Sequence, residues 1–268
     1  MIVIAIIGIL AGMVVVNMSG ATDSARVAKS KAFSSSLRSS LLMNRVSEWN
    51  FDEVSGTSAL DAWGSNPGTL VNGPVRKSGS DCVSGGCLQF DGTDDYVISN
   101  VSISSSDSYS IELWFKSFGN TSGKHIFEGN ILSSPSLEGT DSTYRFYIGN
   151  TAPVEIGAIS VGRWYHFFGT FDKPTGTRKA YFDGRLMGTN ISTVSDNMAI
   201  FYLASRGGST RFFNGSIDET RIYNAALPAA AVRENYFAGL EKLLAGGRIN
   251  EEEYQQRSSE LNLSYAAK

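Results

Sequence analysis

Histidines and carboxylates are the residues of this 268-residue chain best suited to general acid–base chemistry, and their spacing argues against catalysis. His166 is one of two histidines and lies within the aromatic run 164–171, where a packed side chain is expected. Asp218 and Glu219 are adjacent in a predicted strand, so we expect them to point to opposite faces. No Gly-x-Ser-x-Gly, His-Glu-x-x-His or phosphate-binding loop occurs. The sequence therefore predicts a protein that is not an enzyme.

Carboxylates also bind hard cations, and calcium is the one cofactor that the sequence suggests. Asp52 and Asp61 lie near the start of a region of short predicted strands, and Asp218 lies on its last strand. If the two ends of that region meet, the three side chains can converge on one calcium ion. The alternative is that Asp52 and Asp61 cap turns. A further acidic run is interpreted as turn residues: Asp91, Asp94 and Asp95.

The two cysteines, Cys82 and Cys87, are close in sequence and are predicted to form one disulfide. An isolated pair is typical of an exported chain, and closing so small a loop contributes about 2 kcal/mol of stability. A zinc site is the weaker alternative, because no second Cys or His cluster completes the four ligands.

Residues 47–227 have the pattern of an all-β domain. Short runs of alternating apolar and polar residues are separated by Gly, Asn, Asp and Ser, with no helical periodicity between them. Residues 109–116 alternate in this way, and Asp183-Gly184 is a strong hairpin signal. About a dozen short strands predict an antiparallel sandwich or jelly roll.

Five segments of this region, in their order, resemble landmarks of laminin-G-like domains of the concanavalin-like jelly-roll superfamily. The segments begin at Trp49, Leu88, Ser110, Trp164 and Phe213. The resemblance implies two facing antiparallel sheets that bind glycans or proteins, often with one calcium ion. Glycosidases of that superfamily carry Glu-x-Asp-x-x-Glu on one strand, and this chain lacks the spacing.

Residues 1–46 are predicted to form one long helix. The first 16 residues are apolar without interruption, which excludes an ordinary surface helix, and helical spacing continues from Ala25 to Leu41. The apolar part spans about 24 Å, somewhat less than a membrane crossing needs. Such a helix has no partner within a single globular domain.

The run Val3-Ile4-Ala5-Ile6-Ile7-Gly8-Ile9-Leu10-Ala11 resembles the start of bacterial type IV pilins and pseudopilins. The family's preceding Phe-Thr-Leu-Ile-Glu-Leu has no counterpart in this chain. The resemblance implies a helix that is anchored in the inner membrane and then packs with its own copies in a homopolymer. A secretory signal peptide is the alternative. The expected filament-core residues are Ile2, Ile4, Ile6, Ile7, Ile9, Leu10 and Val14.

Helical periodicity returns at residues 228–268. Val232, Tyr236 and Leu240 share one stripe, the glycines at 246–247 can end a first helix, and Asn250 can cap a second. The segment resembles a short helical module found at many bacterial C-termini. We interpret it as a helical hairpin packed on the sandwich, with a partner-docking arm as the alternative.

The sequence thus predicts an α+β chain with a long N-terminal α-helix, an all-β antiparallel jelly-roll sandwich and a C-terminal helical hairpin. Its net charge of −3 makes nucleic acid an unexpected partner. The expected function is that of a pilin in an extracellular cell-surface filament that displays the sandwich for weak adhesion to glycans or surfaces. A pseudopilin of a type II secretion-like system and a jelly-roll glycan hydrolase are the alternatives. Candidate glycan contacts are Trp63, which can instead fold onto the sandwich, Asn120 and Lys124.

Overall fold

The computed structural model describes residues 42–104, 107–119, 122–129, 135–140, 143–148, 152–191 and 198–266. The chain divides into two units, residues 1–43 and residues 44–268, and the account below concerns the second. Residues 1–41, which include every predicted filament-core residue, lie outside the described residues, so the N-terminal helix stays a prediction. In the described part of the chain, no helix is both long and apolar enough to span a membrane.

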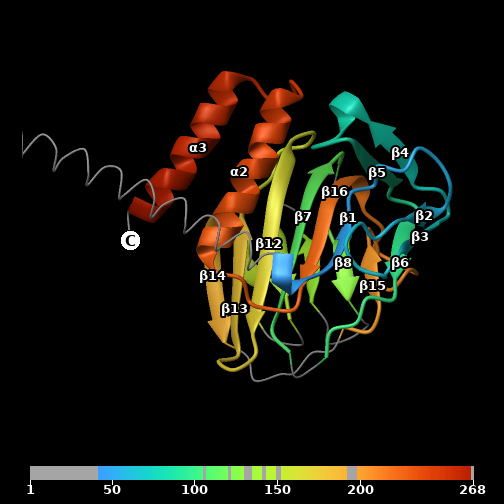
Figure 1. The fold of residues 1–268 in the computed structure, drawn as a ribbon, viewed down its shortest axis with the longest axis horizontal. Coiled ribbons are helices and arrows are strands. Elements are labelled where there is room, and N and C mark those ends of the chain that lie inside the picture. The colour runs from blue at the N-terminus through green and yellow to red at the C-terminus, as the bar shows by residue number, and fades with distance from the viewer. Residues whose placement is uncertain are drawn as a thin grey trace, which may run out of the picture. The chain divides into compact units, whose positions relative to one another are not determined.

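Residues 44–268 contain two antiparallel sheets that face each other (Figure 1). Sheet A consists of β1 (Arg45–Trp49), β4 (Val75–Ser78), β5 (Gly86–Asp91), β7 (Tyr109–Ser117), β12 (Trp164–Asp172), β13 (Thr177–Phe182), β14 (Arg185–Ile191) and β16 (Asn214–Tyr223). Sheet B consists of β2 (Ser58–Ala59), β3 (Gly68–Val71), β6 (Tyr96–Ser99), β8 (His125–Gly129), β9 (Ser136–Gly139), β10 (Tyr144–Tyr147), β11 (Val154–Glu155) and β15 (Phe201–Leu203). The predicted antiparallel sandwich is therefore confirmed.

The strand order explains how one chain builds both sheets. In sheet A it is β14-β13-β12-β7-β16-β5-β4, and in sheet B it is β11-β10-β9-β8-β15-β6-β3-β2. One edge of β16 is shared, because residues 214–217 pair with β5 and residues 220–223 pair with β1. β5 and β6, which follow each other in the sequence, lie in opposite sheets, so the turn between them crosses the sandwich.

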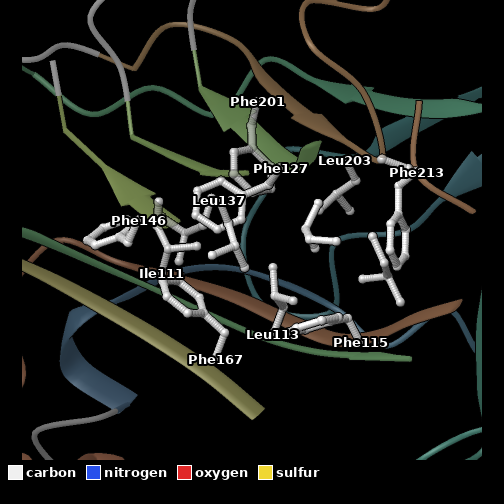
Figure 2. Packing of buried hydrophobic residues seen from close by; sticks show 14 of the residues in the cluster. Ile111, Leu113, Phe115, Phe127, Leu137, Phe146, Phe167, Phe201, Leu203 and Phe213 are labelled. Carbon is white, nitrogen blue, oxygen red and sulfur yellow. The ribbon is translucent and has the colours of Figure 1, made fainter. Parts of the chain in front are cut away.

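The core lies between the sheets and consists mainly of aromatic and branched side chains. Alternation along β7 sends Ile111, Leu113 and Phe115 inward, where each has no exposed surface. Figure 2 shows them facing Phe127 of β8 and Phe201 of β15 across the interior. Burial of such side chains is the main driving force of folding and keeps the two sheets together.

Two local predictions about turns and loops are confirmed. Asp183 and Gly184 have φ of 48° and 72° and connect β13 to β14 in a two-residue hairpin loop. Both central residues of this loop need positive φ, which Gly and Asp tolerate best. Cys82 and Cys87 form a disulfide and are fully buried. This disulfide closes the loop that follows η1 (Gly79–Asp81), and Asp52 holds the same loop through the N–H of Gly86 at 2.6 Å.

The C-terminal segment forms α2 (Ala229–Ala245) and α3 (Glu251–Ala266), which pack against each other and on sheet A (Figure 1). Gly247, at φ 70°, ends α2, where the N–H of Arg248 returns to the carbonyl of Leu243. Asn250 caps α3 by accepting the N–H of Glu253 at 2.8 Å. The interpretation as a helical hairpin on the sandwich is therefore confirmed.

Candidate functional site

The outer face of sheet A is covered by α2. Trp114 of β7 stacks on Tyr236 of α2 with ring centroids 5.8 Å apart, and both side chains are buried. His166 lies beside Trp114, and its Nε2 is 3.1 Å from Oε1 of Glu112. His166 is therefore a packed side chain, as the sequence predicted. A ligand in solvent cannot reach this part of sheet A.

A charged network lies on the same covered face. Arg221 of β16 donates to Glu48 of β1 at 2.6 Å, to Glu112 of β7 at 3.3 Å and also to Glu219. Burial by itself raises the pKa of Glu112, but Arg221 and the hydrogen bonds that Glu112 accepts outweigh burial and bring its pKa down to about 2. The network thus holds buried charge in paired form, which suits a structural role.

Asp218 and Glu219 lie on the same side of sheet A, and the prediction of opposite faces is wrong. Glu219 has φ 48° within a bulge between Asp218 and Arg221, and the bulge interrupts the alternation. Asp218 accepts two backbone N–H groups of the disulfide loop 82–87, and Glu219 accepts the Lys242 ammonium of α2 at 2.6 Å. Burial and the Glu219 charge raise the pKa of Asp218 well above its usual range.

The three carboxylates predicted to bind calcium do not meet. Asp61 accepts four backbone N–H groups, from its own loop and from β1. Burial by itself raises the pKa of Asp61, but these hydrogen bonds outweigh burial and lower its pKa. Asp52 and Asp218 each hold the disulfide loop instead. Among the described residues, three possible ligand atoms lie within 4.8 Å of one another in one group: Asp91, Asp94 and Asp95. Asp91 and Asp95 also take part in the hydrogen bonds of that turn. Calcium binding stays a prediction without an assigned site.

Two of the three predicted glycan contacts, Trp63 and Lys124, are described by the structure and lie in separate loops. Trp63 has 46% of its surface exposed, and the Arg45 guanidinium lies over its ring at 5.2 Å from the centroid. Lys124 directly precedes β8 of sheet B, and its carbonyl accepts the N–H of Gly139. Asn120 lies outside the described residues. Trp63 is thus accessible to a ligand, and its role as a glycan contact stays a prediction.

The outer face of sheet B carries a cluster of aromatic rings that sequence analysis did not single out. Tyr202 of β15 lies between the inward-facing Phe201 and Leu203, so alternation points its ring outward. Its ring is 6.2 Å from Tyr96 of β6, which in turn is 6.4 Å from Phe212. All three rings of this aromatic cluster are partly exposed. The alternation within Phe201–Leu203 was the available signal, but a three-residue strand is too short to identify from the sequence alone.

A buried carboxyl lies next to this aromatic cluster. Glu128 of β8 is the strand partner of Tyr202 and is 5% exposed. Oε1 of Glu128 is 3.7 Å from Nε of Arg206, and Gly207 donates a backbone hydrogen bond to the carboxyl. Burial outweighs these contacts and raises the pKa of Glu128 to about 7, so part of the population is protonated near neutral pH. Oε2 of Glu128 has no hydrogen-bond partner among the described residues.

The arginines of this face are already paired with carboxylates. Arg206 lies beside Glu128, Arg211 donates to Glu138 of β9, and Arg145 of β10 donates to Glu155 at 2.6 Å. His125 lies next to Arg211, and burial together with the arginine charges lowers its pKa to about 3, so this histidine is neutral. The face thus offers stacking rings, phenol groups and a carboxyl, without an unpaired arginine in the part of the chain that the structure describes.

A jelly roll of two facing antiparallel sheets is an architecture that lectin domains use. The Laminin_G_3 family model, "Concanavalin A-like lectin/glucanases superfamily", matches residues 91–233, more than half of the chain. The chain therefore belongs to this family and is a concanavalin A-like lectin/glucanase domain. The search of curated proteins found no match.

Solved structures show the same fold at low sequence identity. Domain 4 of AbnA, an extracellular arabinanase of Geobacillus stearothermophilus in complex with arabinotriose, is 21% identical with a TM-score of 0.55, over 71% of this chain and 97% of that one. The binding domain of Paraclostridial Mosquitocidal Protein 1 is 13% identical with a TM-score of 0.61, over 75% and 53%. Trypanosoma rangeli sialidase in complex with sialic acid is 12% identical with a TM-score of 0.57, over 72% and 33%. This chain thus spans about half of the second protein and a third of the third.

Proposed function

We propose that this chain is a carbohydrate-binding domain whose ligand lies on the outer face of sheet B. The observation that carries the proposal is the aromatic cluster of Tyr96, Tyr202 and Phe212 beside the buried carboxyl of Glu128. Aromatic faces pack against the apolar side of a sugar ring, while phenol and carboxyl oxygens hydrogen-bond its hydroxyl groups. The covered outer face of sheet A offers no such access beneath α2.

The charge pattern favours a neutral glycan as the ligand. A negatively charged sugar needs an unpaired cation, and each arginine described on this face has a carboxylate partner. Glu128, ionised beside Arg206, can accept a hydrogen bond from a sugar hydroxyl. Neutral arabinotriose, the ligand bound to the similar arabinanase domain, is therefore a suitable first probe.

Tyr202→Ala is expected to weaken oligosaccharide binding about two- to twelvefold, because loss of one aromatic stacking contact costs about 0.5–1.5 kcal/mol. Titration calorimetry with arabinotriose and a panel of neutral oligosaccharides measures this effect. Trp63→Ala is the matched control, since Trp63 is an exposed aromatic residue in a separate loop. Binding lost in Trp63→Ala and kept in Tyr202→Ala would place the site at the loop instead.

Incubation of the chain with the same oligosaccharides shows whether it only binds them or also hydrolyses them. We expect no release of reducing ends, because hydrolysis needs a second free carboxylate near Glu128, and Glu138 is engaged by Arg211. Glu112 and Glu219 lie under α2. Release by the wild-type chain that Glu128→Gln abolishes would identify a glycan hydrolase. Glu128 has the raised pKa that suits a general acid, so this comparison is a direct test of the enzymatic alternative.

We also propose that residues 1–46 display this domain on an extracellular, cell-surface filament, with a pseudopilin as the alternative. The support is the resemblance of residues 3–11 to type IV pilins, together with an uninterrupted apolar stretch that does not suit an ordinary surface helix. Repetition along a polymer raises the avidity of a weak site without any new contact.

Ile6→Asp is expected to abolish filament assembly while the thermal unfolding of the sandwich stays unchanged, since a charge in an apolar helix core is costly. Electron microscopy of purified chains measures assembly. Normal filaments in the variant, or monodisperse wild-type particles, would contradict the filament proposal.

A further inference from the structure

The outer face of sheet B is covered to different degrees on the two sides of Tyr202. On the side of β8 and β9 the outward side chains are buried, since Glu128 is 5% exposed and Ser136 is 7% exposed. On the other side β6, β3 and β2 follow in that order (Figure 1), and Thr69 of β3 and Ser58 of β2 are exposed. The open half of this face therefore consists of β15, β6, β3 and β2, and a ligand stacked on Tyr202 can extend over it.

The register of these strands places four outward side chains of the open half in one row. Tyr202 pairs with Ile98, Ile98 pairs with Thr69, and Thr69 pairs with Ser58. Residues that pair across antiparallel strands point to the same face of the sheet. Neighbouring strands are about 4.8 Å apart, so the row measures about 14 Å from β15 to β2. A single sugar ring stacked on Tyr202 covers only one end of this row.

The open half also differs from the rest of the face in charge. Its outward side chains are all uncharged: Tyr96, Ile98, Thr69, Val71, Ser58 and Tyr202. At its rim, Asp94 is an exposed carboxylate in the turn before β6. Arg76 donates to the carbonyl of Ser58 at 2.7 Å and forms an ion pair with Glu53 at 2.8 Å. A carboxylate and a paired arginine at the rim favour an uncharged ligand over an acidic one.

We propose that the open half binds a segment of several sugars from a neutral, linear polysaccharide, which crosses β6 and β3 towards β2 from the ring stacked on Tyr202. This inference rests on the carbohydrate binding proposed above and adds the length and the direction of the ligand. Ile98 and Val71 offer apolar surface to the faces of the sugar rings. The exposed hydroxyl groups of Thr69 and Ser58 can both donate and accept hydrogen bonds with sugar hydroxyls.

Titration calorimetry of the full chain with arabinobiose and arabinotriose tests the length of the site. Arabinotriose is expected to bind at least fivefold more tightly, because its third ring reaches the part of the row at Thr69. Thr69→Arg places a long, charged side chain across the row and is expected to reduce the affinity for arabinotriose to that for arabinobiose. Thr189→Arg is the matched control, since Thr189 is an exposed threonine of β14 in sheet A, and it should leave both affinities unchanged.

Thermal unfolding checks that Thr69→Arg is folded, and Thr69→Glu serves as a second blocking variant. Equal affinities for the two sugars, or an unchanged affinity of both blocking variants for arabinotriose, would overturn the extended site while stacking on Tyr202 stands. A loss of arabinotriose binding in Tyr147→Ala, on β10, that the blocking variants do not show would place the ligand on the other side of Tyr202 and also overturn it. Tyr202→Ala without effect on either sugar would instead contradict the proposed function itself, so the two proposals can fail separately.

Discussion

Arg221→Met is expected to lower the free energy of unfolding by about 3–5 kcal/mol, because it removes the cation from a network of buried carboxylates. Arg221 lies in one row with Glu48 and Glu112 across three neighbouring strands, and it also contacts Glu219. Methionine fills a similar volume, so packing changes little, while Glu48, Glu112 and Glu219 each lose one cationic partner. Urea denaturation followed by tryptophan fluorescence measures the change.

Arg145→Met is the matched control for this prediction. Arg145 and Glu155 also form an ion pair, but their side chains are 41% and 53% exposed. An exposed pair contributes roughly 0–1 kcal/mol, since water screens it. Equal effects of the two substitutions would show that burial of the Arg221 network does not set its energy.

The pH dependence of the same comparison gives a second measurement. The pKa of Glu112 in the folded chain is about 2, below its ordinary value of 4.5. A depressed acid pKa stabilises the folded state above pH 4.5, and this contribution is lost as the pH falls from 4.5 towards 2. The difference in the free energy of unfolding between the wild-type chain and Arg221→Met should therefore become smaller as the pH falls from 4.5 towards 2. Above pH 4.5 this difference should stay constant.

Gly239→Ala is expected to destabilise the chain by about 2–3 kcal/mol, even though alanine favours a helix by about 1 kcal/mol over glycine. Gly239 lies in α2 above Trp114, and a Cβ at this position would be 2.3 Å from Cζ2 of that indole. Trp114 is buried in sheet A and cannot move away without disturbing its stack on Tyr236. The added methyl group therefore pushes α2 off the sheet.

Hydrogen exchange of α2, together with denaturation, measures this effect. Ala238→Ser is the matched control, since it alters the neighbouring, exposed position of α2 and should change stability by less than about 0.5 kcal/mol. A Gly239→Ala chain as stable as the wild type would show that α2 shifts to accommodate the added methyl group. It would then follow that α2 is not tightly packed on sheet A.

The covering hairpin also bears on function. Its contacts with Trp114, Trp164 and Gly184 occupy the outer face of sheet A, where they bury a histidine and several carboxylates. The aromatic cluster of sheet B has no such cover in the part of the chain that the structure describes. This asymmetry is why the proposed glycan site lies on sheet B.

Features that depend on a few neighbouring residues were predictable from the sequence alone. The alternation of apolar and polar residues identified the strand at 109–116. The tolerance of Asp and Gly for positive φ identified the turn at Asp183-Gly184, and Asn250 was recognised as a helix cap. The disulfide was predictable for the same reason, because its two cysteines lie five positions apart. Such features arise from local sterics and local hydrogen bonds, which the sequence states directly.

Features that depend on distant residues were decided by the tertiary structure. Asp218 was expected at a calcium site, yet it binds backbone amides 134 and 135 residues away, and a bulge turns Glu219 to the same side. Arg221 and Glu48 meet across 173 residues. Tyr202 became a candidate ligand contact because β6 and β15 pair in sheet B, which brings its ring to Tyr96. Pairing across such separations is set by how both sheets bury their apolar faces together, and no short segment contains that information.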